Sequence, residues 1–101
     1  MTTTLAIAKE FSKTICFGTE HAHQFLEELL LPRFLEAKAK GGTLLIDLDG
    51  VLGYPTCFLR SAFGGLAKIV SPKDAMERLQ FVSNDEPLLP EEIGIYINEV
   101  E

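Results

Sequence analysis

The stretch that decides the fold is Thr43-Leu44-Leu45-Ile46-Asp47-Leu48-Asp49-Gly50. Its middle is an almost uninterrupted run of leucine and isoleucine, which is typical of a strand at the centre of a sheet with both faces covered. The pair Asp49-Gly50 is a turn signal that ends this strand. The rest of the chain is therefore expected to supply neighbouring strands and the helices that cover them.

The residues before this stretch predict two short strands and one long helix. Thr3–Ala8 alternates weakly and indicates an edge strand, and Thr14–Phe17 is expected to pair with it. Thr19 is the expected N-cap of a helix that ends at Gly41-Gly42, with a kink or break at Pro32. The apolar residues at helical spacing, which form its expected buried side, are Phe25, Leu26, Leu29, Leu30, Phe34 and Leu35.

The residues after the stretch predict a second long helix, a short helical turn, a strand and a final helix. Gly53–Thr56 is expected to form a turn in which Thr56 is the N-cap of the second long helix. Gly64-Gly65 lies inside that helix and predicts close packing against the sheet. Ser71-Pro72 opens the helical turn, and Leu79–Val82 is the last predicted strand. The expected buried residues of the second long helix are Phe58, Leu59, Ala62, Phe63, Leu66 and Ile69. The final helix begins at Pro90-Glu91-Glu92 and is expected to dock through Ile93, Tyr96, Ile97 and Val100.

The predicted order of elements is strand, strand, helix, strand, helix, strand, helix. Strand–helix–strand crossovers require parallel strands and a right-handed connection. The expected fold class is therefore α/β, with a small mixed, mostly parallel sheet of about four strands and helices packed on it. The chain has 101 residues and is 47% apolar, which suffices for one core. We expect a single domain over residues 1–101.

The charge distribution argues against several classes of function. The net charge is -6, and the nine basic residues are scattered, whereas nucleic-acid binding requires clustered Lys and Arg. The same balance disfavours an anionic membrane surface, and no apolar stretch is long enough to span a bilayer. Without a secretory signal, the two cysteines, Cys16 and Cys57, are expected to be reduced thiols of a soluble, cytoplasmic protein. Two cysteines are too few ligands for a metal site, and we expect no cofactor.

The segment Leu44–Leu52 resembles motif one of the haloacid-dehalogenase phosphatases. In that family the first aspartate attacks phosphorus and the second acts as acid and base beside magnesium, which would assign these roles to Asp47 and Asp49. The remainder of the chain fits poorly, because the only later acidic pairs, Asp85-Glu86 and Glu91-Glu92, lie in loop or helix-start contexts. In the simpler interpretation the two aspartates belong to a strand end and a turn.

Other catalytic arrangements are weaker. His21 and His23 are two residues apart on a predicted helix, so their side chains point in different directions, and we interpret them as surface residues. Cys57 is close to a helix N-terminus, where a thiol pKa can fall, but no histidine follows it to serve as a base. We expect an inert, buried thiol, no catalytic residue and no enzymatic activity.

A longer stretch, Asp47–Leu66, resembles the bacterial STAS-like domain family of unknown function. The shared features are Asp-Leu-Asp-Gly, a following Gly-Tyr, a small hydroxyl residue, Phe-Leu, and then Ala-Phe-Gly-Gly-Leu. The flanks are similar too: Phe25–Pro32 resembles the family's first helix, and Leu79–Asn98 resembles its last strand and helix. This resemblance covers most of the chain.

The resemblance implies a regulatory, protein-binding function. Related STAS domains include anti-sigma-factor antagonists, which bind an ATPase of the histidine-kinase-like fold and are switched by phosphorylation of a Ser at a helix start. The matching position here is Thr56, with Cys57 where a second Ser often stands. A phosphate would add about -1.5 to -2 charge at pH 7 beside the positive end of the helix. Two positions that are often acidic in the family are Arg60 and Ser61 here.

Three hypotheses follow. The leading one is a partner-switching module used in signalling, and the candidate residues for its phospho-acceptor and partner surface are Asp49, Tyr54, Thr56, Cys57, Arg60 and Ser61. The second is a phosphatase that uses Asp47 and Asp49. The third is a structural or oligomerising domain, for example a homodimer, that pairs through the edge strand Thr3–Ala8. In the first hypothesis Thr56 is a switch, whereas in the others it is only a helix cap.

Overall fold

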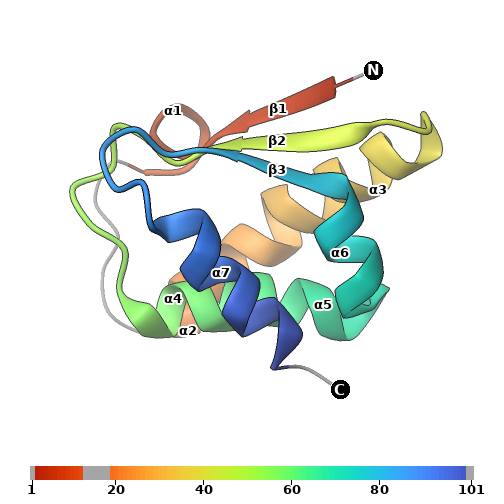
Figure 1. Ribbon diagram of the computed structural model, residues 1–101. Helices are drawn as coiled ribbons and strands as arrows, with labels where there is room; N and C mark the ends of the chain where they lie inside the picture. The colour runs from red at the N-terminus through yellow and green to blue at the C-terminus, as the bar shows by residue number, and fades with distance from the viewer. Residues whose placement is uncertain (1, 13–18, 100–101) are drawn as a thin grey trace.

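The computed structural model describes residues 2–12 and 19–99, in which three strands and several helices alternate along the chain (Figure 1). The π-helical segments, η1 and η2, lie inside longer helices. The elements are β1 (Thr2–Ala6), α1 (Ile7–Glu10), α2 (Thr19–Phe25), η1 (Leu26–Leu30), α3 (Leu31–Ala39), β2 (Thr43–Asp47), α4 (Thr56–Leu59), η2 (Arg60–Gly64), α5 (Gly65–Val70), α6 (Pro72–Arg78), β3 (Leu79–Val82) and α7 (Leu89–Asn98).

The sheet has the order β1-β2-β3, and both described strand pairs are parallel. The prediction that Thr43–Leu48 forms the central strand is confirmed: Leu44 of β2 aligns with Thr3 on one side and with Leu79 on the other. The α/β class is confirmed as well. The structure describes three strands where about four were predicted, and the predicted strand Thr14–Phe17 lies outside the described residues.

The longer helices all lie on one side of the sheet (Figure 1). Leu44 and Ile46 of β2 point to that side and are fully buried, whereas Leu45 points to the other side and is partly exposed. The prediction that both faces of β2 are covered is therefore wrong for the described part of the chain. The run of three apolar residues indicated a central strand correctly, but Leu45 belongs to an uncovered face.

The first long helix consists of α2, η1 and α3, which follow one another without a break. It continues through Pro32 instead of breaking there, because a π-helical segment precedes the proline and the Leu31 N–H bonds to the Leu26 carbonyl. The prediction that Leu35 is buried is wrong, since its side chain is 48% exposed. Phe34 and Ala37, three residues apart, face the core instead and leave Leu35 at the side of the helix.

The second long helix consists of α4, η2 and α5, and it too contains a π-helical segment. Five of its six predicted core residues are buried, but Ile69 is 57% exposed, and Ala67 faces the core after η2. The predicted use of the paired glycines also needs correction. A Cβ on Gly65 would lie 2.8 Å from Leu26 Cδ2, so this glycine permits a close approach of the two long helices rather than of a helix and the sheet.

Aromatic rings join the two long helices to the sheet. The Phe25 ring lies 5.5 Å from the Phe58 ring and 6.3 Å from the Phe63 ring, measured between centroids. Phe63 in turn contacts Phe81 of β3 edge-on, with centroids 5.9 Å apart. Phe25, Phe58 and Phe63 are fully buried, and such ring pairs contribute about 0.5–1.5 kcal/mol each beyond their burial. This cluster fixes how the helices sit on the sheet.

The outer edge of β1 is occupied by two charged side chains. The Arg33 guanidinium of α3 donates to the Thr4 carbonyl at 3.0 Å, and the Ala6 N–H donates to the Glu10 carboxylate at 3.0 Å. Arg33 and Glu10 also form an ion pair with each other. Exposed edge groups are the template on which another strand can add, so this arrangement protects β1 against strand addition.

We expect Arg33→Ala to have two effects. It should lower the free energy of unfolding by about 1–2 kcal/mol, because Thr4 and Glu10 both lose a partner, and it should increase self-association through the freed edge. Urea unfolding and light scattering measure these two effects. The matched control is Lys40→Ala, because the pair of Lys40 with Glu36 is exposed and its loss should leave the free energy of unfolding almost unchanged. Equal effects of the two substitutions would refute the edge-protecting role.

Candidate functional site

Two loops at the carboxyl ends of β2 and β3 are tied together by carboxylates. Asp49 accepts hydrogen bonds from the backbone N–H groups of Asn84 (2.7 Å) and Asp85 (2.9 Å) and from the Asn84 side-chain amide (2.9 Å). Asp85 returns the contact by accepting from the Gly50 N–H at 3.1 Å. Gly50 has a φ of +89°, and a Cβ there would lie 3.1 Å from Ala8 Cβ, so the turn requires glycine. The predicted turn at Asp49-Gly50 is confirmed.

The two aspartates of the phosphatase-like motif are both used within this turn. Asp47 accepts from the Asp49 N–H at 3.0 Å, while the Asp49 carboxylate holds the other loop. The hydrogen bond from Asp85 is the largest of the effects that hold the pKa of Asp49 below its usual value. Within the described ranges, no three His, Cys, Asp or Glu side chains gather closely enough to bind a metal ion.

Tyr54 anchors the segment that connects the first of these tied loops to the second long helix. Its hydroxyl donates to the Leu48 carbonyl at 2.8 Å, and its ring packs near the Phe58 ring, with centroids 6.3 Å apart. Burial, reinforced by the charge of Asp47, raises the pKa of the Tyr54 phenol well above its usual value. Of the predicted site residues, Asp49 and Tyr54 therefore make contacts within the fold that set the position of Thr56.

Thr56 is the first residue of the second long helix, and its side chain is exposed. The prediction that Thr56 is the N-cap is wrong: Pro55 occupies the cap position with extended backbone (φ -60°, ψ 141°), and no side chain caps this helix end. The fixed φ of proline places the helix start one residue earlier than the Thr pattern suggested. The neighbouring Cys57 is a free, partly buried thiol.

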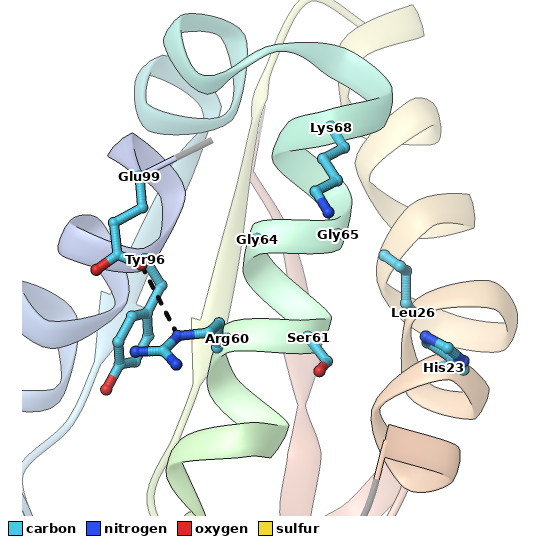
Figure 2. Close-up of a pocket in the computed structure, with 9 residues that line it drawn as sticks. All are labelled: His23, Leu26, Arg60, Ser61, Gly64, Gly65, Lys68, Tyr96 and Glu99. Carbon is cyan, nitrogen blue, oxygen red and sulfur yellow. Dashed lines mark ion pairs between the residues drawn. The ribbon is translucent and has the colours of Figure 1, made fainter. Parts of the chain in front are cut away.

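A groove of about 690 Å³ runs along the second long helix, and we call it the helix groove (Figure 2). The first long helix forms one wall and α7 forms the other. Its lining residues are His23, Leu26, Arg60, Ser61, Gly64, Gly65, Lys68, Tyr96 and Glu99. The predicted site residues Arg60 and Ser61 thus lie in one groove, at the end closer to Thr56.

Arg60 has two neighbours on the α7 wall. Its guanidinium carbon lies 5.1 Å from the centre of the Tyr96 ring, and its Nε lies 3.8 Å from the Glu99 carboxylate. The Tyr96 hydroxyl donates to Glu92 at 3.1 Å. Burial and the bond to Glu92 raise the pKa of Tyr96, and the nearby Thr56 hydroxyl opposes that rise. Thr56 and Arg60 therefore both lie beside one tyrosine.

The sequence profile of the STAS-like domain of unknown function matches residues 21–89, more than half of the chain. The chain belongs to this family. No curated protein and no solved structure matches it significantly. The matched region of this STAS-like domain contains the first long helix from residue 21 onward, the whole second long helix, Thr56 and the tied loops. The α7 wall of the groove follows it in the sequence. Among residues 2–12 and 19–99, no helix combines the length and apolar character needed to cross a membrane.

Several residues of the helix groove were not predicted from the sequence. Lys68 follows Arg60 and Gly64 at steps of four residues, a spacing that places all three on one helix face and could have been recognised. His23 was interpreted as a surface residue, and it is exposed at the rim of the groove. Tyr96 was expected to dock α7, which its burial confirms, but its contact with Arg60 joins segments far apart in the sequence.

The tied loops predict a defined dependence of stability on pH. Because the pKa of Asp49 is lower in the folded chain than its ordinary value of 3.8, the carboxylate stabilises the fold above that pH. This contribution is lost as the pH falls through the lowered value. We expect Asp49→Ala to lower the urea midpoint at pH 7, with a difference from the wild type that narrows as the pH falls below 3.8. Glu77→Ala, at an exposed position on α6, should change little at either pH. A gap that stays constant with pH would contradict this role of Asp49.

Proposed function

We propose that this STAS-like domain is a non-enzymatic protein-binding module of the partner-switching type, gated by phosphorylation of Thr56. The observation that carries the proposal is the position of Thr56: its side chain is exposed at the start of a helix, one turn before a groove-lining arginine. A modifying enzyme could reach such a side chain without unfolding the domain. The family resemblance supports a partner of the histidine-kinase-like ATPase fold.

A phosphate on Thr56 would act through local charge. It would bring about -1.5 to -2 charge to the helix start at pH 7, one turn from the Arg60 guanidinium. It would also repel Glu92, whose carboxylate accepts a hydrogen bond from the nearby Tyr96 hydroxyl. The ion pair of Arg60 with Glu99 is exposed and contributes little, so a nearby phosphate can attract the Arg60 guanidinium. The groove surface would then change at the end where Thr56 lies.

The hydrogen bonds of Asp49 and the contacts at the β1 edge favour this proposal over the two alternatives. A phosphatase would need the carboxylates of Asp47 and Asp49 to face a substrate, but Asp49 already accepts three hydrogen bonds from the neighbouring loop. An oligomerising function through β1 would need a free strand edge, but Arg33 and Glu10 occupy that edge in the described part of the chain. Both π-helical segments, which are frequent at functional sites, contribute residues to the groove.

The test compares the charged and neutral substitutions of one residue. A partner ATPase recovered with the wild-type domain should bind Thr56→Glu roughly tenfold more weakly than the wild type, measured by calorimetry. Thr56→Gln, which has the same size without the charge, should bind within about twofold of the wild type. Because Thr56 is exposed and caps no helix, both variants should unfold within about 0.5 kcal/mol of the wild type. Equal affinities of Thr56→Glu and the wild type would eliminate the switch.

A further inference from the structure

The helix groove carries positive charge on a chain whose net charge is -6. Arg60 lies toward one end, and Lys68 lies two turns further along the same helix. Lys68 is exposed and has no ion pair or hydrogen bond with the described residues. Among the described residues that line the groove, only Glu99 carries a carboxylate, and its contact with Arg60 is long, at 3.8 Å. Such a surface attracts a ligand of negative charge.

The floor between the two cations is uncharged and free of large side chains. It consists of Gly64 and Gly65, with Leu26 from the first long helix beside them. In Figure 2 the Lys68 side chain runs back along the helix toward Gly65, while Arg60 is turned toward Tyr96 on the opposite wall. A ligand backbone can therefore approach the helix closely between two positive ends.

The spacing of the cations distinguishes between kinds of anion. Eight residues separate Arg60 from Lys68, which corresponds to about 12 Å along a helix axis. An extended peptide advances roughly 3.3 Å per residue, so side chains four residues apart are about 13 Å apart and point to the same face. The carboxylates of a short diacid such as succinate are separated by only two methylene groups, which is much less than the spacing of the two positions along the helix, so such a diacid is a poorer match.

We propose that the helix groove binds an extended acidic segment of a partner protein, in which two carboxylates four residues apart engage Arg60 and Lys68. An apolar side chain midway between them lies on the same face and would rest against Leu26 and the glycines. This inference deepens the proposed function by naming the chemistry of the partner segment that binds the helix groove. The groove can bind such a segment whether or not Thr56 is ever phosphorylated.

Glu99 acts as an internal competitor in this arrangement. Its side chain is 52% exposed and that of Arg60 is 60% exposed, and ion pairs between such exposed groups contribute little. A carboxylate of the partner segment can therefore replace Glu99 at Arg60. Removing the Glu99 charge should then strengthen binding, an effect opposite to that of removing a cation.

The experiment titrates the isotope-labelled full chain with a capped peptide and follows backbone amide shifts by NMR. The probe is Gly-Glu-Ala-Leu-Ala-Glu-Gly, and the control peptide has both glutamates replaced by glutamine. We expect saturable shifts centred on Ser61, Gly64 and Gly65 at concentrations on the order of 1 mM, with at least threefold weaker binding of the glutamine peptide and of succinate. Shifts that avoid these residues, or equal binding of all three probes, would overturn the proposal.

Matched variants test the individual contacts. Lys68→Gln should weaken binding of the glutamate peptide by roughly two- to fivefold, whereas Lys73→Gln, an exposed lysine of α6, should not. Glu99→Gln should strengthen binding by a similar factor, whereas Glu91→Gln, exposed on the same helix, should not. Equal effects within either pair would mean that only net charge matters and would overturn the proposal. None of these binding measurements involves Thr56. Their outcome is therefore independent of the phosphorylation test.

Discussion

The contact between Leu26 and Gly65 is the constraint on which the rest of the structure depends. With any side chain at Gly65, its Cβ would lie 2.8 Å from Leu26, so the two long helices could not keep this separation unless Leu26 moved. The close approach brings Phe25 within 5.5 Å of Phe58, and this aromatic pair anchors both helices over the buried face of the sheet. It also leaves a shallow floor without side chains, bounded by α7, where the helix groove forms. Core packing and the candidate binding surface therefore share one cause.

The sequence was sufficient to predict where the helices and strands lie, but not which side chains of the long helices face the core. The central strand, the end of the first helix at its paired glycines and the last strand follow from local patterns, and each is found as predicted. Leu35 and Ile69 were assigned to the core by regular helical spacing, but each follows a π-helical segment that shifts the buried face. The regular spacing of apolar residues did not mark the two π-helical segments, Leu26–Leu30 and Arg60–Gly64.

The candidate site could be predicted where it is local in sequence. Thr56, Arg60 and Ser61 were identified from one continuous stretch, and the structure places the latter two in one groove, with Thr56 one turn before them. Tyr96 and Glu99 were not identified with them, since only the tertiary fold brings α7 beside the second long helix. Asp49 is the opposite case, because its pattern resembled catalytic chemistry until the structure revealed the loop that its carboxylate holds. The residue type alone did not distinguish a catalytic aspartate from one that holds a neighbouring loop.

The most direct test of the helix groove as the partner surface is site-specific photo-crosslinking in the native cell. A photo-crosslinking amino acid would replace Ser61, which lines the groove, or Gln80, which is exposed on the uncovered face of the sheet. The account predicts a discrete crosslinked protein from position 61 and none from position 80. A crosslinked partner from position 80 alone, or the same product from both positions, would contradict it and move the binding surface to the open face of the sheet.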